Sequence, residues 1–323
     1  MDKYYLTMDI GATKTSSALF NQEGTLLDNF VALAKSKTYE GQEAVYQNTK
    51  SVLDVVIEHF SLNMDKVQAI GVGSPGPLDS KKGIIIHAPL MGWRNFPIVE
   101  KLEKNYKKKV FLDNDGNLGA LAEVRCGVAK GLSNILYMTV STGCGGGIII
   151  NNQVYHGVTD GAGEVGHMTI DPNGLDCPCG SKGCFELYAS GTAMNLKMQH
   201  DMEAGEKSRV FELAEYDKTK INGYLLDIAA SEGEKYALDL FKKEGYYLGV
   251  SIANQFNMMN PECIVLGGGV TKSKRFFHDE LIKTLKKYCI QEVKEDSVRY
   301  STLNDRVVLY GAFFNVKEKM LRD

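Results

Sequence analysis

Apolar residues along this chain form two recurring patterns: short runs that predict β-strands, and longer stretches with spacings of three and four that predict helices. At the start, strands are predicted over residues 4–10, 17–20 and 26–34, joined by small-residue turns. Residues 41–60 have helical spacing, and residues 67–72 return to a strand. Three strands, a helix and a further strand in this order predict a mixed sheet.

A second strand-to-helix passage covers residues 109–112 and 118–126 and ends at Gly127. The strand pattern then begins again, whereas residues 200–235 are polar and show no strong period. The elements predicted beyond Gly127 are strands at 135–140, 147–150, 154–156 and 263–266, and helices at 241–259, from about 271, and at about 307–321.

The length of 323 residues exceeds the usual size of one compact domain. Together with the repeated pattern, it predicts two α/β lobes. The smaller lobe covers residues 1–117 and is completed by the C-terminal helix at about 307–323. The larger lobe covers residues 118–306.

The composition, with 44% hydrophobic and 24% charged residues and a formal net charge of −3, is that of an ordinary globular protein. Lysine and arginine are scattered, which argues against a nucleic-acid-binding surface. No apolar stretch approaches the roughly 18–20 residues of a bilayer span, so no membrane partner is expected. The first strand begins near residue 4 and leaves no room for a signal peptide, so we expect a cytoplasmic protein.

Three loops rich in small residues each follow a predicted strand. The first runs from Asp9 to Thr15, the second covers residues 139–147, and the third covers residues 267–269. Backbone N–H groups in such turns form concavities that bind anions, and the third loop also precedes a predicted helix. Each loop alone is more often a simple tight turn, but the three together indicate nucleotide binding.

Two common nucleotide motifs do not account for these loops. The P-loop pattern G-x-x-x-x-G-K-[ST] does not occur in the sequence. Residues 71–76 match G-x-G-x-x-G after a strand, but Pro77 and an apolar strand led by Gly83 follow where a dinucleotide site needs a helix. We expect this loop to form a backbone wall of a pocket.

Seven cysteines is an odd number, and three of them form a compact cluster with one histidine that suits a metal better than disulfides. The predicted ligands are His167, Cys177, Cys179 and Cys184, the Cys₃His set of a closed, structural zinc site. The alternatives are scattered buried thiols or a nucleic-acid zinc finger, for which the chain lacks a basic surface. Glu164 and Glu186 flank the cluster, and a zinc ion would hold both in place.

On these motifs the chain resembles the ROK proteins (repressors, open reading frames and sugar kinases) of the actin-like ATPase superfamily, over nearly its whole length. The motifs are Gly163-Glu164-x-Gly166-His167, Cys177-x-Cys179-Gly180-x-x-Gly183-Cys184-x-Glu186, Asp9-x-Gly11-x-Thr13-Lys14, Ser141-Thr142-Gly143-x-Gly145-Gly146-Gly147 and Gly267-Gly268-Gly269-Val270. The resemblance implies a two-lobed actin-like ATPase (ribonuclease H-like) α/β fold, with mixed sheets flanked by helices and a zinc knuckle. It also implies a homodimer, with a tetramer as the alternative, whose dimerisation surface lies in the larger lobe.

The resemblance also implies a role for each matching residue. Asp115 is the implied catalytic base, and its place at the start of a predicted helix favours an ionised carboxylate, although a helix cap is the alternative use of such a residue. Sugar binding is implied for Gly76, Asn114, Asp115, Glu164, His167 and Glu186. ATP binding is implied for Asp9, Gly11, Thr13, Lys14, Thr142, Gly143, Gly145, Gly267, Gly268 and Gly269, with Mg²⁺ on the phosphates and Zn²⁺ in the knuckle.

The implied activity is transfer of the γ-phosphoryl group of ATP to the 6-hydroxyl of a hexose. Glucose comes first because Glu164 and the segment leading to Glu186 look most like glucokinases. N-acetylmannosamine or another N-acetylhexosamine is the alternative, followed by fructose and by a sugar-responsive regulator without catalysis. Such regulators carry a helix-turn-helix domain ahead of the phosphate loop, whereas Asp9 lies close to the start here. Leu90 lies close to where many family glucokinases carry an Asn, and Trp93 is interpreted as a packing residue.

Overall fold

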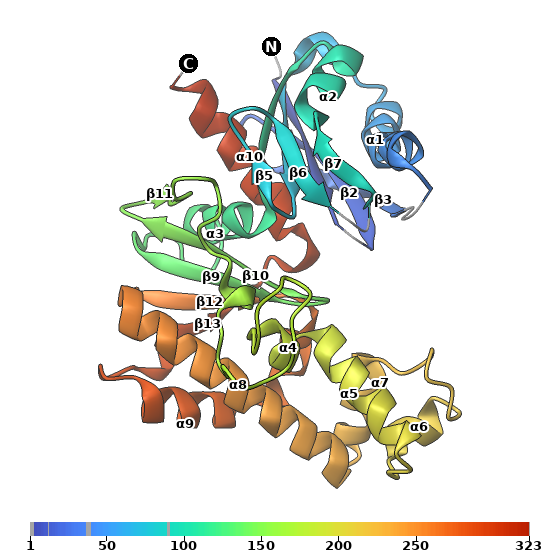
Figure 1. The fold of residues 1–323 in the computed structure, drawn as a ribbon. Helices are drawn as coiled ribbons and strands as arrows, with labels where there is room; N and C mark the ends of the chain where they lie inside the picture. The colour runs from blue at the N-terminus through green and yellow to red at the C-terminus, as the bar shows by residue number, and fades with distance from the viewer. Residues whose placement is uncertain (1–2, 12, 37–39, 89–90, 323) are drawn as a thin grey trace. The chain divides into compact units, whose positions relative to one another are not determined.

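The computed structural model describes residues 3–11, 13–36, 40–88 and 91–322, and Figure 1 shows its helices and strands. The chain folds into two compact units. The first unit contains Met1–Ser133, Gly147–Gly163 and Thr302–Asp323, and the second contains Asn134–Gly146 and Glu164–Ser301. Residues 118–133 and 147–163, which the sequence assigned to the larger lobe, therefore belong to the first unit.

A mixed sheet forms the centre of the first unit, as predicted, and it has five strands. Its strand order is β3-β2-β1-β4-β8, formed by Leu26–Lys35, Lys14–Asn21, Tyr4–Ile10, Val67–Ser74 and Lys109–Asn114. Strands β1, β4 and β8 are parallel, with Asp9 opposite Gly73 and Gly73 opposite Asp113. The carboxyl ends of these three strands therefore meet at one edge of the sheet.

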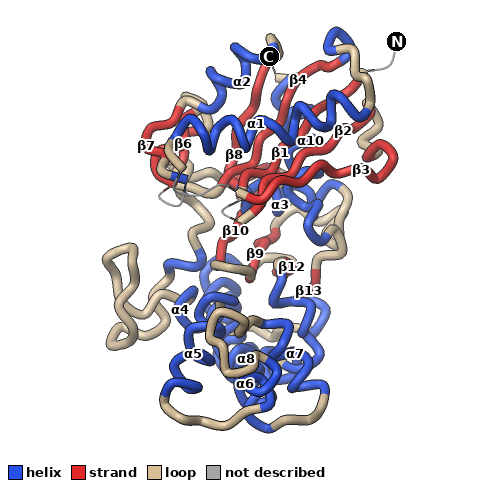
Figure 2. The backbone as a smooth tube through the Cα atoms, turned by 90° about the vertical axis from the view of Figure 1, so that its right-hand side faces the viewer, coloured by secondary structure: helices blue, strands red, loops and turns tan. Residues whose placement is uncertain are grey.

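Alternating side chains of β1 face two different hydrophobic layers, as a period of two requires. Leu6, Met8 and Ile10 pack with α1 (Gln42–His59) and α2 (Ile98–Tyr106) on one face, and Figure 2 shows α1 lying across the strands. Tyr5 packs on the other face with Phe313 of α10 (Val307–Met320). The predicted C-terminal helix thus completes the core of the first unit.

A small three-stranded sheet, β5-β6-β7, lies beside the α1 layer and is formed by Leu78–Asp79, Ile84–Ala88 and Trp93–Phe96. Trp93 is buried, stacks on Phe96 at 4.5 Å between ring centroids, and donates its indole N–H to the carbonyl oxygen of Gln42. The interpretation of Trp93 as a packing residue is confirmed. Leu90 lies outside the described residues.

Helix α3 (Asp115–Arg125) follows β8 directly and begins three residues earlier than predicted. It packs so closely on α10 that a Cβ at Gly311 would lie 1.9 Å from the carbonyl oxygen of Leu118. Strand β10 (Cys144–Ile150) starts in the second unit and ends in the first, where it pairs with β11 (Gln153–Val154). The strand predicted over 154–156 is therefore only partly formed.

In the second unit, the parallel strands β9 (Ile135–Val140), β12 (Cys263–Gly267) and β13 (Val298–Tyr300) lie side by side. The long helix α8 (Lys235–Met259) packs closely against α9 (His278–Tyr288). Gly245 and Gly249 of α8 permit this approach, because a Cβ at either position would clash with atoms at or just before α9. Helix α8 ends at Asn260, which has a left-handed backbone conformation before Pro261.

Residues 200–235 contain two helices that the sequence pattern did not predict, and a further helix leads into them. They are α5 (Gly191–Glu203), α6 (Arg209–Leu213) and α7 (Gly223–Ser231). Each helix is preceded by a capping residue whose side-chain oxygen accepts a backbone N–H of the first turn. The capping residues are Ser190, Ser208 and Asn222, respectively. The helix expected from about residue 271 is also different, because a 3₁₀ segment, η4 (Gly269–Phe276), precedes α9. Within the described ranges, no helix combines the length and apolarity that crossing a lipid bilayer requires.

Candidate active site

The edge where β1, β4 and β8 end brings together several predicted site residues of the first unit. Asp9 lies near the end of β1, and Asn114 and Asp115 lie at the junction of β8 and α3. The loop after Asp9 is closed by backbone hydrogen bonds from Gly11 N–H to Lys14 and from Ser36 N–H to Thr13. These bonds hold the described residues of the first predicted phosphate loop, which lies next to the predicted sugar-binding pair.

Three carboxylates and one ammonium group interact around Asp9. Burial is the largest cause that raises the pKa of Asp9 to about 7, and the negative charges of Asp115 and Asp305 add to it while Lys14 opposes it. The Lys14 ammonium donates a hydrogen bond of 2.5 Å to Oδ2 of Asp305. A cluster with more negative than positive charge fits a divalent cation, which would favour the ionised form of Asp9.

Asn114, not Asp115, caps helix α3. Oδ1 of Asn114 accepts the backbone N–H groups of Gly116 at 2.9 Å and Asn117 at 3.3 Å. Asp115 is then the first helical residue, and its own Oδ1 accepts the Gly116 N–H at 2.8 Å. Because Asn114 performs the capping, the carboxylate of Asp115 lies at the positive end of the helix, and Asn114 keeps its amide N–H groups as donors for a ligand.

The glycines before Gly76 serve packing in the first unit. A Cβ at Gly71 would lie 2.5 Å from the carbonyl oxygen of Ala312, and one at Gly73 would lie 2.4 Å from Val308, both in α10. The G-x-G-x-x-G match at residues 71–76 therefore lets α10 approach strand β4, and Gly76 follows in the loop after that strand.

The other two glycine-rich loops lie together in the second unit. Strands β9 and β12 are parallel, with Thr139 opposite Gly267, so the loops that follow them leave the sheet at the same edge. Gly268 has φ of 90°, and a Cβ there would lie 2.3 Å from the carbonyl oxygen of Val140. The third loop can therefore approach the second only because position 268 is glycine.

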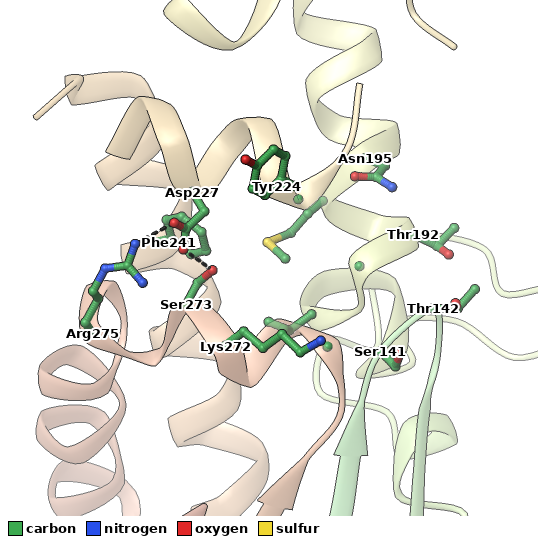
Figure 3. Close-up of a pocket in the computed structure, with 15 residues that line it drawn as sticks. Ser141, Thr142, Thr192, Asn195, Tyr224, Asp227, Phe241, Lys272, Ser273 and Arg275 are labelled. Carbon is green, nitrogen blue, oxygen red and sulfur yellow. Dashed lines mark hydrogen bonds and ion pairs between the residues drawn. The ribbon is translucent and has the colours of Figure 1, made fainter. Parts of the chain in front are cut away.

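A pocket of about 630 Å³ opens where these loops meet α5, α7 and η4 (Figure 3). Its volume lies in the range of small-molecule sites. Lys272 extends into it toward the loop with Ser141 and Thr142, and within the described part of the chain it has no ion-pair partner. On one side of the pocket, Oδ2 of Asp227 accepts Ser273 Oγ–H, and Oδ1 accepts a guanidinium N–H of Arg275, both at 2.5 Å.

Glu186 joins the second loop to the segment that follows the cysteine cluster. Its Oε2 accepts the Cys144 backbone N–H at 2.7 Å, and a Cβ at Gly143 would lie 2.4 Å from the same oxygen. Glu186 starts the short helix α4 (Glu186–Ala189), two residues after Cys184. One carboxylate oxygen is therefore engaged with the predicted phosphate loop, and Oε1 remains for a ligand.

The structure brings the four predicted metal ligands together. One ligand atom from each of His167, Cys177, Cys179 and Cys184 lies within 4.8 Å of the others. Zn–S bonds of about 2.3 Å in a tetrahedron place sulfur atoms about 3.8 Å apart. The Sγ atoms of Cys179 and Cys184 are 3.6 Å apart, so the donor set and its spacing both fit zinc.

The turn of the cysteine cluster depends on two glycines in left-handed conformations, Gly180 and Gly183. At Gly183 a Cβ would lie 1.6 Å from the carbonyl oxygen of Asp171. Glu164 precedes the 3₁₀ turn η3 (Val165–His167), and both Glu164 and His167 are exposed. A histidine that binds metal through one ring nitrogen keeps the other for a hydrogen bond, so both predicted uses of His167 are chemically compatible.

The sequence interpretation missed most of the pocket lining. Thr192, Asn195, Tyr224, Asp227 and Lys272 come from helices that lack a strong apolar period or from the 3₁₀ segment. The available signals were the helix-start pairs, Ser190 before Gly191 and Asn222 before Gly223.

Two α/β units whose parallel strands end in glycine-rich loops make up the actin-like ATPase fold. The chain belongs to the ROK family, whose model matches residues 5–319. It is 34% identical to a glucokinase of Halalkalibacterium halodurans, over 98% of this chain and 96% of that protein. It is 33% identical to the xylose repressor of Bacillus subtilis, over 84% of this chain and 65% of the repressor. A crystal structure of a ROK family glucokinase from Streptomyces griseus, in complex with glucose and AMPPNP, has a TM-score of 0.83 at 28% identity and covers 96% of this chain and 97% of its own.

Proposed function

We propose that this protein is an ATP-dependent hexose kinase that phosphorylates the 6-hydroxyl of glucose. The observation that carries the proposal is the edge of the first sheet, where Asp115 begins a helix capped by Asn114 beside Asp9. It is supported by the likeness, over nearly the full length of both chains, to a glucokinase. A xylose repressor is almost as similar in sequence, so the activity needs a direct test.

In the proposed reaction, Asp115 accepts the proton of the sugar 6-hydroxyl while the oxygen of that hydroxyl attacks the γ-phosphorus of ATP. The bond from the γ-phosphorus to the bridging oxygen breaks, which yields the sugar 6-phosphate and ADP. Sugar-binding roles are proposed for Gly76, Asn114, Glu164, His167 and Glu186. A correctly placed hydroxyl is most of what such a reaction requires from the protein.

The ATP-binding role is proposed for both sets of glycine-rich loops. In the first unit the loop from Asp9 to Lys14 would hold phosphate groups, and Asp9 would hold Mg²⁺, which neutralises phosphate charge when bound. In the second unit, the pocket between the loops at 141–145 and 267–269 has the size and chemistry for the nucleoside. Lys272 adds a positive charge at this pocket.

The zinc site is proposed to be structural. Four protein ligands leave no open position for a substrate, and the knuckle ends two residues before Glu186. When bound, zinc crosslinks the segment between His167 and Cys184. This fixes the start of α4, and with it the Glu186 carboxylate that bonds to Cys144.

The test is an ADP-release assay with Mg-ATP and glucose, mannose, fructose, N-acetylmannosamine or N-acetylglucosamine. We expect the highest kcat/KM with glucose, none with 6-deoxyglucose, and a loss of about 10²- to 10⁴-fold in the Asp115→Asn variant, the size of a general-base contribution. Asp65→Asn is the matched control, because Asp65 is an exposed carboxylate of the same unit.

Three outcomes would contradict parts of this proposal. A higher kcat/KM with an N-acetylhexosamine would keep the kinase and replace the sugar. Full activity of Asp115→Asn would remove the base from this residue. A sugar that raises the melting temperature without any ADP release would indicate a sugar-binding regulator.

A further inference from the structure

A histidine–aspartate pair lies beside the proposed catalytic segment, and the reaction above gives it no role. Nε2 of His156 is 2.9 Å from Oδ2 of Asp113 and 3.2 Å from Oδ1. The Asp113 side chain is 1% exposed and that of His156 is 29% exposed. His156 follows β11 and Asp113 lies on β8, and both belong to the first unit.

The ionisation of the pair defines which atom donates. Burial raises the pKa of Asp113, but the hydrogen bond and charge of His156, with Lys319 and Asn117, together bring it below its ordinary value. The bond to Asp113 is the main cause that raises the pKa of His156; burial and Lys319 oppose it, and the charges of Asp113 and Asp160 favour it. An ionised carboxylate can only accept, so Nε2 of His156 carries the hydrogen whether the ring is neutral or charged.

Asp113 connects His156 to both sides of Asp115. Oδ1 of Asp113 accepts the backbone N–H of Asn114 at 2.9 Å and the side-chain amide of Asn117 at 3.1 Å. Asn114 precedes Asp115, and Asn117 lies in the first turn of α3 behind it. A movement of the Asp113 carboxylate would therefore release the turn that carries Asp115.

The segment that carries His156 is itself held in place within the first unit. Ala162 donates its backbone N–H to the carbonyl oxygen of His156 at 3.2 Å. Oδ2 of Asp160 accepts the backbone N–H of Ser80 at 2.7 Å. His156 is thus anchored on its own side, which is what a residue needs in order to restrain a partner.

We propose that His156 is a positioning residue for phosphoryl transfer. Its Nε2–H holds the Asp113 carboxylate, which in turn holds residues 114–117 and the Asp115 carboxylate in the reacting orientation. The inference rests on the proposed role of Asp115 as the base. Asp113 does not touch substrate in this scheme; it acts through the helix start that it supports.

Three variants test the inference in the full-length protein. His156→Phe keeps a ring but removes the donor, His156→Gln restores an N–H donor, and His59→Phe is the matched control, because His59 is exposed on α1 and stacks on Phe30. We expect His156→Phe to lower kcat by about 10- to 100-fold, the cost of a misplaced catalytic group, with KM for Mg-ATP changed less than about threefold. His156→Gln is expected to recover most of kcat, and His59→Phe to retain it.

Hydrogen exchange measured by mass spectrometry gives a readout that does not need turnover. The peptide covering residues 112–118 should exchange faster in His156→Phe than in the wild type, and at the wild-type rate in His156→Gln. The inference would be overturned if His156→Phe had the exchange rate and the kcat of the wild type. It would also be overturned if the kcat of His156→Gln were as low as that of His156→Phe. If the wild type phosphorylates no sugar, faster exchange in His156→Phe alone supports the positioning role while the kinase proposal fails. Should His156→Phe not fold, His156→Ala with added imidazole replaces it, and failure of imidazole to restore slow exchange counts against the inference.

Discussion

Glu244 is a buried acid that should destabilise this protein at neutral pH. It lies on α8, it is 1% exposed, and neither of its carboxyl oxygens has a hydrogen-bond partner among the described residues. Burial raises the pKa of Glu244 well above its ordinary value. It lies near Cys144, whose thiol pKa is raised first by burial and then by the carboxyls of Glu244 and Glu186. The native state therefore holds Glu244 as the neutral acid.

Replacement of Glu244 by Met should raise the free energy of unfolding through two contributions, one independent of pH and one that depends on pH. Removing a buried polar group without a partner is worth about 1–3 kcal/mol, and both residues are good helix formers. The second amount depends on pH, because the unfolded chain releases this proton above a pKa of about 4.3 while the native state keeps it. The wild-type free energy of unfolding then falls by up to about 1.4 kcal/mol per pH unit as the pH rises, a cost that the Met variant does not have.

Urea unfolding followed by far-UV circular dichroism at pH 5.5 and 7.5 measures both amounts. The stability difference between Glu244→Met and wild type should be positive at pH 5.5 and larger at pH 7.5, by up to about 2.7 kcal/mol. Glu206→Met is the control, an exposed glutamate of the same unit that should change stability by less than about 0.5 kcal/mol at either pH. A destabilised Glu244→Met protein, or a difference that stays constant with pH, would refute the reasoning.

Three further results are expected. Cys184→Ser should lower the zinc content measured by atomic absorption from about one per chain to near zero. Cys263→Ser is the control, because Cys263 lies on β12 and is not one of the four ligands, and this variant should keep the metal. Zinc bound by both variants, or by neither, would contradict the proposed site. Because the pKa of Asp9 is raised to about 7, kcat/KM for Mg-ATP should fall up to tenfold per pH unit below pH 7 as the carboxyl protonates, and a flat profile between pH 6 and 8 would exclude this role. Lys272→Ala should raise KM for Mg-ATP by about tenfold, the size of one charge-assisted contact, with an unchanged KM for the sugar, whereas the neighbouring Lys274→Ala should not.

The pattern of apolar residues predicts most strands and several helices, because each of these elements buries side chains that are close together in the sequence. The bounds of β1 and β9 match the predicted ranges, and β3, α1, β12 and α10 differ by one or two residues. Helix α1 buries one face, so its burial follows the helical spacing of its apolar residues, whereas β1, β9 and β12 are buried along most of their length and therefore appear as short apolar runs. The cysteine cluster is predictable for a similar reason, since three of its four ligands lie within eight residues.

What the sequence hides is interaction between distant or weakly patterned segments. The bond between His156 and Asp113 joins residues 43 positions apart, and nothing near either residue indicates the other. The helices α6 and α7 are short, so their apolar faces contain too few residues to show a period, and only their caps mark them. The pocket lined by α5, α7 and η4 could not be predicted before those elements were known.

The three consecutive residues at the end of β8 show how one strand-to-helix junction separates structural and chemical tasks. Asp113 is still on the strand, and its carboxylate is buried. Four groups interact with it: the backbone N–H of Asn114 and the side chains of Asn117, His156 and Lys319. Asn114 has the extended conformation of an N-cap and satisfies two helix amides. Asp115, the first residue with helical geometry, accepts the Gly116 N–H through Oδ1 at the positive end of the helix, which supports the proposal that its carboxylate is the base. The same substitution, Asp to Asn, should then differ between the two positions: at 113 it removes a buried charge that four groups depend on, and at 115 it removes a proton acceptor while the Gly116 N–H still finds an oxygen.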